Sequence, residues 1–331
     1  MFAQKMLASS WLLKSGWIFA VLAFSAPLKA EWYSDSAGIM GTNIYVEVWA
    51  ETPVQGQLAL RTVMAEMERI NQLMSPYIET SELSMINANA GTKPLVISDE
   101  MFELLDKSVK ISELTKGAFD ITFASVGYLY NYKESERPDE ATIASLLDAI
   151  NYKHIVLNKE NKTVSFSNRN VKIDLGGIAK GHAVDNSVSL LQRMGILHGL
   201  VTAGGDTRLI GDRRGKPWIV GIRDPRNKEK QAVVMPLQDS AMSTSGDYER
   251  YFEEDGQRYH HILSPKTGKS TYEVQSVSII GPSSTFNDAL STAVFVMGLR
   301  EGLGMINRID GYDAVVLDNE RKMHYSNGLQ Q

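Results

Sequence analysis

Two oxygen-bearing side chains stand four residues apart in the segment FNDALSTA, residues 286–293. If this segment is a helix, Asp288 and Thr292 lie on one face. A carboxylate and a hydroxyl are costly to bury among apolar residues without a partner. They can contribute to a Mg²⁺ site, which usually combines few protein ligands with water and substrate phosphate. The alternative is that Asp288 interacts with the helix dipole and Thr292 bonds back to its own turn.

A histidine and several carboxylates are further candidates for chemistry. His261 ends a predicted strand just before a Ser-Pro pair, where its imidazole could be a general base near neutral pH. The alternative for a single histidine is a structural role. The carboxylates at or near strand–turn junctions, where ligand-binding groups are commonly displayed, are Asp174, Asp185, Asp206 and Asp247. Some of them must serve only as caps.

The stretch VKIDLGGIAKGHAVD, residues 171–185, is the centre around which we expect the chain to be organised. It reads as a short strand over 171–173, a turn at Gly176 and Gly177, and a helix ending at about Met194. A helix that begins after such a turn offers free backbone N–H groups and a positive dipole end, which suits a phosphate-bearing ligand. The alternative is a tight turn with no ligand.

Composition limits the class of protein. The chain has 331 residues, 43% of them hydrophobic and 22% charged, with a net charge of −5. This length is sufficient for one large domain or two closely packed ones. The mild acidity argues against nucleic acid as a partner, because there is no basic stripe to neutralise phosphates. With no repeats or linker-like runs, we predict one continuous catalytic unit over residues 31–331.

The first 30 residues have the pattern of a secretory signal. Lys5 and Lys14 precede an apolar run over 17–24, and small residues follow, with cleavage expected after Ala30 or Ala26. The apolar run is shorter than the roughly 20 residues of a spanning helix. The alternative is an uncleaved anchor that keeps the protein at the inner membrane. Because the chain has no cysteine, disulfides, thiolate ligands and a lipid anchor on cysteine are excluded, and we predict a released periplasmic protein.

Hydrophobic periodicity and turn signals predict an α+β fold. The expected helices cover 57–74, part of 78–91, 98–116, 137–151, the stretch ending near 194, and a segment from about 284 to 297, with a last helix and hairpin behind them. The expected strands lie within 38–49 after a glycine-containing turn, and at 153–157, 163–166, 171–173, 218–222, 232–237, 241–243, 259–263 and 275–280. The aromatic run Tyr128, Tyr130 and Tyr132 could be a stacking surface or half-buried packing.

An ordered set of motifs resembles the ApbE family, the FAD:protein FMN transferases. The matching segments are MGT at 40, SPY at 75 with SELS at 81, GAFDIT at 117, DLGGIAKG at 174, AGGD at 203, STSGDY at 243, HILSPKTG at 261 and DALSTA at 288. Each motif alone is weak, but the set in this order is specific and spans most of the chain after the signal.

The resemblance implies a fold and a chemistry. The fold is an ApbE-like (T-fold-like) α+β arrangement of mixed, largely antiparallel sheets packed with helices. Enzymes of this family bind FAD with a divalent metal, normally Mg²⁺, and pass FMN to a threonine hydroxyl of a partner protein while AMP is released. Such chemistry requires a metal to neutralise the pyrophosphate, a base for the threonine proton and a flavin pocket.

The resemblance also assigns residues. The metal would be held by Asp288, Thr292 and the backbone carbonyl of Gly177, and His261 would be the base or a phosphate-positioning group. The residues that would contact FAD are Met40, Tyr77, Ala118, Phe119, Asp120, Asp174, Lys180 and Ile262. A lysine at position 180 adds positive charge beside a phosphate, so no loss of FAD binding is expected from it.

The resemblance also predicts an acceptor protein, and three other functions are competing hypotheses. The chain has no acceptor motif of the D-G-x-T type that these enzymes modify, so the target threonine should lie on another protein. A subunit of a membrane redox complex, such as a sodium-pumping quinone reductase or its Rnf-type relative, is the expected kind of acceptor. The competing hypotheses are a metal-dependent FAD pyrophosphatase that yields FMN and AMP, a flavin-binding protein without turnover, and a secreted α+β binding protein without flavin.

Overall fold

The computed structural model describes residues 30–330. The predicted signal over residues 1–30 therefore lies outside the described part, apart from Ala30. Within 30–330, no helix is both long enough and apolar enough to cross a membrane.

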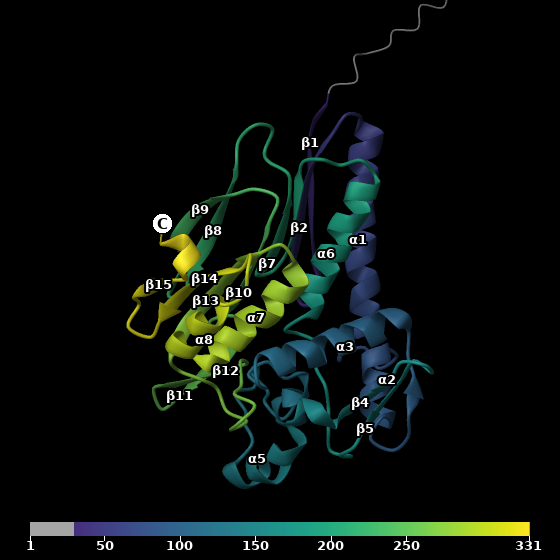
Figure 1. The fold of residues 1–331 in the computed structure, drawn as a ribbon, viewed down its shortest axis with the longest axis vertical. Helices are drawn as coiled ribbons and strands as arrows, with labels where there is room; N and C mark the ends of the chain where they lie inside the picture. Colours follow the sequence, from purple (N-terminus) through teal and green to yellow (C-terminus); the bar gives the residue numbers. More distant parts are fainter. Residues whose placement is uncertain (1–29, 331) are drawn as a thin grey trace, which may run out of the picture.

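An eight-stranded antiparallel sheet forms the centre of the molecule (Figure 1). Its strands, in spatial order, are β1 (Glu31–Ile39), β2 (Thr42–Ala50), β6 (Gly199–Ala203), β7 (Asp206–Ile210), β10 (Ala241–Gly246), β13 (Val274–Gly281), β14 (Asp313–Asp318) and β15 (Met323–Tyr325). Each neighbouring pair is antiparallel. The α+β class with largely antiparallel sheets is therefore confirmed.

Three smaller antiparallel sheets surround the central one. They are formed by β3 (Leu95–Val96), β5 (Thr163–Phe166) and β4 (Ile155–Asn158), by β8 (Trp218–Asp224) with β9 (Asn227–Leu237), and by β11 (Tyr251–Glu254) with β12 (Gln257–His260). The β8–β9 ribbon packs Ile222 against Met242 of β10 and Val315 of β14. This contact makes a second, smaller core on the central sheet.

A layer of helices packs along the central sheet. α1 (Pro53–Met74) contacts β1 and β2, α6 (Ala179–Arg193) contacts β6 and β7, α7 (Ser284–Met297) contacts β10 and β13, and α8 (Leu299–Ile306) contacts β14. α1 and α6 run side by side (Figure 1). The remaining helices are α2 (Glu82–Asn89), α3 (Asp99–Leu114), α4 (Ala124–Gly127) and α5 (Glu140–Leu146), with short 3-10 turns η1 (Ile121–Phe123), η2 (Leu147–Ala149), η3 (Tyr152–His154) and η4 (Asn327–Leu329).

The predicted long helices follow from their periodicity and caps. In α1 the buried side chains recur at helical spacing and include Leu60, Val63, Met67 and Ile70. The Thr52 hydroxyl caps α1 by accepting from the N–H of Gln55 at 3.1 Å, and Ser98 caps α3 in the same way. α6 ends at Arg193 and α7 begins at Ser284, close to the predicted bounds.

Residues 171–173 are not a strand, so this prediction was wrong. The segment is extended, but side chains rather than a neighbouring strand satisfy its backbone. The amide of Asn87 both donates to the carbonyl of Ile173 at 2.9 Å and accepts from its N–H at 2.8 Å. The N–H of Lys172 donates to the Ser125 hydroxyl at 3.0 Å. An apolar run predicts extended backbone, but only tertiary partners decide whether a ladder forms.

Two other predicted elements differ at their bounds. The helix expected over 137–151 is reduced to α5, capped by Asp139, and then breaks into the 3-10 turns η2 and η3. Ala149 and Ile150 are buried within this break, so core packing overrides the helical period there. The turn that we expected at the start of 38–49 lies at Met40 and Gly41, both of which have positive φ. Strand β1, which precedes this turn, was not predicted, and its side chains are mostly exposed.

An ion-pair network joins α1, α3 and α6 outside the candidate site. Arg69 contacts Glu100 at 2.6 Å, and the His182 ring and the Asn186 amide contact the same carboxylate at 2.8 Å and 2.9 Å. The hydrogen bonds from Arg69, and after them those from His182, lower the pKa of Glu100 to about 2 although partial burial opposes the shift. The network therefore stabilises the fold where this carboxyl is ionised.

We expect Glu100→Gln to lower the free energy of unfolding by about 1–2 kcal/mol at pH 7, a value reduced for solvent screening. The folded-state pKa lies below the unfolded one, so the contribution is present above about pH 4.5 and is lost as the pH falls toward about 2. Denaturant unfolding of wild type and of Glu100→Gln across this pH range should show the difference between their free energies of unfolding becoming smaller. The exposed neighbour Glu103 on α3 supplies the control, Glu103→Gln. A difference in the free energy of unfolding that stays constant with pH would show that the ionised Glu100 carboxylate is not the cause.

Candidate active site

Two buried carboxylates and a partly buried lysine meet where α6, α7 and β7 pack together. Lys180, on the first turn of α6, donates from Nζ to Asp206 at 2.7 Å and lies 3.3 Å and 3.4 Å from the two carboxylate oxygens of Asp288 on α7. The N–H of Gly181 donates to Asp288 at 3.2 Å. Asp288 is 3% exposed and Asp206 2%. The cluster holds two carboxylates and one ammonium group, so it has surplus negative charge.

The electrostatics of this cluster favour an additional cation. Burial raises the pKa of Asp288, the nearby Asp206 raises it further, and Lys180 opposes both without outweighing them, so the pKa is raised overall. Burial lowers the pKa of Lys180, but the two carboxylates outweigh burial and raise it above its ordinary value. Lys180 is therefore charged, and the ionised form of Asp288 remains undercompensated. A cation beside Asp288 would stabilise its carboxylate.

Thr292 and Gly177 meet one turn of α7 away from Asp288. A Cβ built at Gly177 would lie 3.3 Å from Thr292 Oγ1 and 3.4 Å from Phe119 Cε2, so a larger residue would crowd both side chains. Ser245 of β10 approaches Thr292 from another side, with 3.2 Å between the two hydroxyl oxygens. The structure thus places Gly177 beside Thr292, which lies one helical turn after Asp288 on α7.

The groups around Asp288 and Thr292 are of the kind a hard cation binds. Within residues 30–330, no cluster of three or more His, Cys, Asp or Glu side chains could hold a metal on its own. A cation here would need hydroxyl, carbonyl, water or phosphate oxygens beside one carboxylate, a donor set that suits Mg²⁺ and does not suit zinc. The hydrogen bonds to the Asp288 carboxylate are long, at 3.2–3.4 Å, so its oxygens are only weakly hydrogen-bonded. The residues therefore fit Mg²⁺.

His261 lies near this cluster and has an unpartnered ring nitrogen. Its Nδ1 is buried without a hydrogen-bond partner, and its backbone N–H donates to the carbonyl of Arg250 at 3.1 Å. Burial, followed by the charge of Arg250, lowers the pKa of His261 to about 3, and the charge of Lys180 contributes to the same shift. The imidazole is therefore neutral at physiological pH, with a proton on one of its two ring nitrogens.

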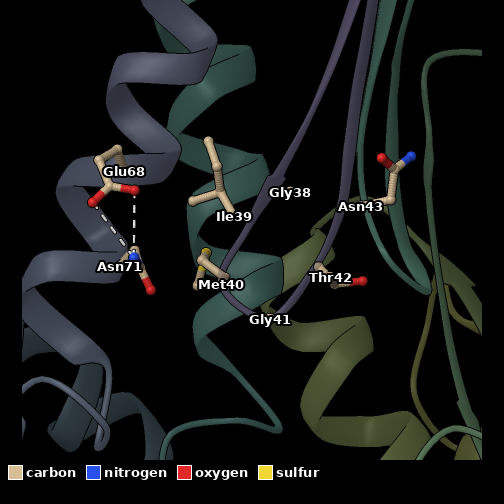
Figure 2. Close-up of a pocket in the computed structure, with 8 residues that line it drawn as sticks. All are labelled: Gly38, Ile39, Met40, Gly41, Thr42, Asn43, Glu68 and Asn71. Atoms are coloured by element: carbon tan, nitrogen blue, oxygen red, sulfur yellow. Dashed lines mark hydrogen bonds between the residues drawn. The ribbon is translucent and has the colours of Figure 1, made fainter.

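Met40 lies at the tip of the β1–β2 hairpin and lines a groove of about 530 Å³ together with Glu68 and Asn71 of α1 (Figure 2). The hairpin tip lies near Arg250, because a Cβ built at Gly41 would lie 3.4 Å from a guanidinium nitrogen of Arg250. Tyr77, in the loop after α1, is 81% exposed. Both residues are accessible, as contacts to a ligand require.

The loop over 118–121 is held by Asp120 and by the core. The Asp120 carboxylate accepts from the N–H of Thr122 at 2.9 Å, from its hydroxyl at 2.6 Å and from the N–H of Tyr152 at 2.7 Å. Its side chain thus shapes the loop. The N–H of Ala118 is bonded within the turn after α3, to the carbonyl of Thr115 at 3.1 Å.

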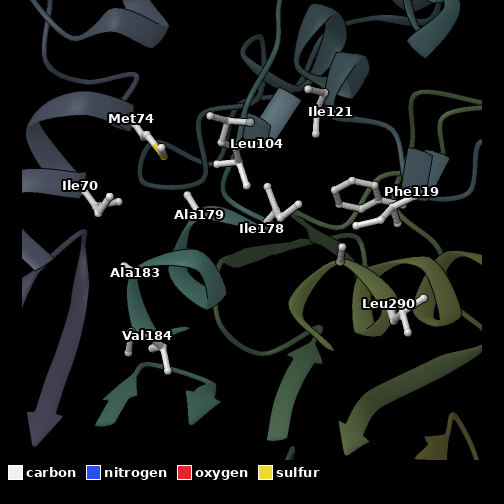
Figure 3. Close-up of a cluster of buried hydrophobic side chains, with 14 of the residues drawn as sticks. Ile70, Met74, Leu104, Phe119, Ile121, Ile178, Ala179, Ala183, Val184 and Leu290 are labelled. Carbon is white, nitrogen blue, oxygen red and sulfur yellow. The ribbon is translucent and has the colours of Figure 1, made fainter. Parts of the chain in front are cut away.

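Phe119 and Ile262 are both almost fully buried, at 3% and 5% exposed. Phe119 belongs to an apolar cluster with Ile178 of the α6 N-cap and Leu290 of α7 (Figure 3). The N–H of Ile262 donates to His260 at 3.3 Å. Asp174 precedes the glycine pair and accepts from the N–H of Gly176 at 2.6 Å.

Several residues of the site carried no assigned role in the sequence. Asp206, seen there only as a carboxylate at a strand–turn junction, is the main partner of Lys180, and Ser245 and Arg250 were not singled out at all. Ser245 belongs to the motif STSGDY over 243–248, most of which lies in β10, and Arg250 follows this motif two residues later. Tyr130 and Tyr132 stack on each other with ring centroids 5.8 Å apart, and the cluster they join is buried, so packing explains them. Tyr128 remains 42% exposed.

Comparisons with known proteins identify the family of this chain. A sequence profile described as the ApbE family matches residues 40–316. A protein of Treponema pallidum named FAD:protein FMN transferase is 32% identical over 90% of this chain and 87% of its own length. The crystal structure of the ApbE protein of Thermotoga maritima superposes with a TM-score of 0.84 at 32% identity, covering 91% of this chain and 98% of the other. The flavin transferase ApbE of Vibrio cholerae superposes with a TM-score of 0.80 at 27% identity, covering 91% and 99%. The chain belongs to the ApbE family.

Proposed function

We propose that this protein is an FAD:protein FMN transferase that moves FMN from FAD to a threonine of a partner protein, depends on Mg²⁺ and releases AMP. The name FAD:protein FMN transferase is that of its Treponema relative. The observation that carries the proposal is the meeting of Asp288, Thr292 and Gly177 beside the N-terminus of α6, with surplus negative charge. His261 supplies a neutral acceptor nitrogen near the same place.

The roles proposed for the residues are those that the family resemblance implies. Asp288, Thr292 and the carbonyl of Gly177 would hold Mg²⁺, which when bound neutralises charge on the pyrophosphate of FAD. The N–H groups of Ala179 and Gly181 in the first turn of α6 are bonded to Leu175 and Asp288, so this turn would offer a phosphate the positive end of the helix dipole. Lys180 places a positive charge at the same turn.

The transfer step balances with these groups. The threonine oxygen of the acceptor bonds to the phosphorus of the FMN half of FAD, and the bond from this phosphorus to the oxygen that joins it to the AMP half breaks. The threonine proton would pass to the imidazole of His261, which is neutral at physiological pH. AMP leaves with the bridging oxygen, and FMN remains on the acceptor as a phosphoester.

The test is to incubate the protein with FAD and Mg²⁺, with and without an acceptor domain that carries a D-G-x-T motif, and to record intact mass and AMP release together. A metal-dependent gain of one FMN on the acceptor establishes the transferase. AMP and free FMN without an adduct, on several acceptors, would indicate the pyrophosphatase. No AMP under any condition would leave a flavin-binding protein and refute the proposal.

Localisation, domain organisation and partner belong to the same proposal. The N-terminal pattern supports export by a signal over residues 1–30 and a periplasmic catalytic domain over 31–331, with attachment to the inner membrane if the signal is retained. An acceptor on a membrane redox complex, of the sodium-pumping quinone reductase or Rnf type, would be reached from that side. Flavin labelling of membrane fractions with and without this protein would identify the acceptor.

For Tyr77, an exposed aromatic ring assigned to flavin contact, we expect Tyr77→Ala to weaken FAD binding about 10-fold, because aromatic stacking on a ring system contributes about 1–2 kcal/mol. The turnover rate at saturating FAD should change less than the affinity. Since Tyr77 is 81% exposed, the melting temperature should not move. Flavin fluorescence titration measures the affinity, with Leu197→Ala, at a residue 71% exposed, as the control. Equal affinities for wild type and Tyr77→Ala would remove Tyr77 from the site.

A further inference from the structure

Asp185 lies on α6 four residues after Gly181 and binds the first turn of α7. One carboxylate oxygen, Oδ2, accepts from the N–H of Thr285 at 2.9 Å, from its hydroxyl at 2.6 Å and from the Ser283 hydroxyl at 2.8 Å. The other, Oδ1, accepts from the N–H of Ser284 at 3.0 Å and from Arg208 at 2.6 Å. One side chain thus binds the beginning of α7 from a different helix.

This contact is electrostatically favourable. The carboxylate stands at the positive end of the α7 dipole and bonds two backbone N–H groups that have no partner within the helix. Burial raises the pKa of Asp185, but the hydrogen bonds from Thr285 and the charge of Arg208 outweigh it, so the pKa is lowered overall. Charge-assisted hydrogen bonds of this kind are stronger than neutral ones.

Gly181 fixes how closely the two helices approach. A Cβ at this position would lie 2.3 Å from the carbonyl oxygen of Ser284 and 2.9 Å from the Cα of Thr285, so any side chain would push α7 away. The N–H of the same glycine donates to Asp288 at 3.2 Å. Gly181 and Asp185 therefore form one face of α6, and the first turn of α7 rests on this face immediately before Asp288.

We propose that Asp185 is a positioning residue for the metal site. By holding the first turn of α7 on α6, it sets the place of Asp288 and Thr292 relative to Gly177, and thereby the affinity for the divalent cation. This inference rests on the proposed function, since it assumes that Asp288 and Thr292 bind a metal. Asp185 itself donates nothing to the cation, because both its oxygens are engaged by α7 and Arg208.

The test compares Asp185→Ala, Asp185→Asn and Thr285→Val with wild type. Binding of Mn²⁺ in the presence of FAD is followed through the loss of the free-ion EPR signal, beside the Mg²⁺ concentration for half-maximal turnover. For Asp185→Ala we expect the dissociation constant for Mn²⁺ and the Mg²⁺ concentration for half-maximal turnover each to rise about 10-fold or more. This is the usual effect of removing a residue that orients a metal ligand. Asp185→Asn keeps an acceptor oxygen and should lie in between. Thr285→Val removes one donor and should show a smaller shift, which keeps the test available if Asp185→Ala does not fold.

The matched control is Thr52→Ala, which removes a helix cap at the start of α1 and should lower the melting temperature without changing Mn²⁺ affinity. If the Asp185 variants lose stability in the same way but bind Mn²⁺ like wild type, Asp185 is only a cap and the inference is overturned. If wild type itself shows no Mn²⁺ binding and no metal-dependent turnover, the proposed function fails and the inference with it. The two failures are distinguished by the wild-type measurement.

Discussion

Replacing Asp288 with asparagine should reduce FMN transfer by about 10³-fold or more while the protein stays folded. The substitution keeps the shape of the side chain and removes the only carboxylate among the three groups assigned to the metal. Loss of metal-assisted charge neutralisation on the pyrophosphate accounts for an effect of this size, about 4 kcal/mol of transition-state stabilisation. Turnover is measured as AMP release at saturating FAD, and metal binding as Mn²⁺ binding.

The Asp288→Asn variant should lose activity without losing stability. Because burial and Asp206 disfavour the ionised carboxyl of Asp288 in the metal-free protein, a neutral amide at this position should not lower the metal-free melting temperature. Glu47→Gln is the matched control, since Glu47 of β2 is also a buried carboxylate, bonded to Arg213 and outside the cluster around Asp288. Mn²⁺ binding should persist in Glu47→Gln. An Asp288→Asn variant with wild-type turnover would show that the metal assignment is wrong.

The second large effect is expected at His261. His261→Ala should slow transfer to the acceptor by about 10²–10⁴-fold, the usual contribution of a positioned base. FAD affinity should change little, because the ring is assigned to the proton of the acceptor hydroxyl. Single-turnover rates of FMN transfer, measured by acceptor mass, give the comparison. His324→Ala provides a control at a histidine that pairs with Asp318, on β15 and β14 at the far edge of the central sheet.

The pH profile gives an independent check of the same residue. Since the pKa of His261 is lowered to about 3, its nitrogen is unprotonated throughout the range from pH 5 to 8. Wild-type transfer should therefore show no loss of rate from histidine protonation near pH 6.5, where an unperturbed imidazole titrates. A loss near pH 6.5 that disappears in His261→Ala would mean that the ring is more exposed to solvent in the working enzyme.

Local patterns predicted most of the helices because their causes are local. Apolar residues at helical spacing and the cap residues Thr52 and Ser98 are visible in any window of the chain, and α1 and α3 follow from them. The same holds for the pairing of Asp288 with Thr292 on one face of α7, which needs only the helical repeat. Family motifs then named the remaining site residues, whose positions no local pattern could relate.

Tertiary structure decided the features that depend on distant partners. Residues 171–173 are an extended segment and not a strand, because the side chains of Asn87 and Ser125 hydrogen-bond to their backbone. Lys180 and Asp206 are 26 residues apart in the chain, and neither residue type indicates that the pair would be buried beside Asp288. Burying such charges costs free energy because packing removes water from them. The sequence alone does not show which charges will be buried in this way.

The sequence by itself thus determined the helices, the antiparallel class and the types of residue available for a metal and a base. Only the tertiary structure decided that Asp185 holds the first turn of α7 and that Gly181 permits the helices to touch. The physical reason is that secondary structure depends on neighbours along the chain, whereas ligand geometry depends on how closely two elements approach. That approach is set by side chains about 100 residues apart, whose contacts exist only after the sheet has folded.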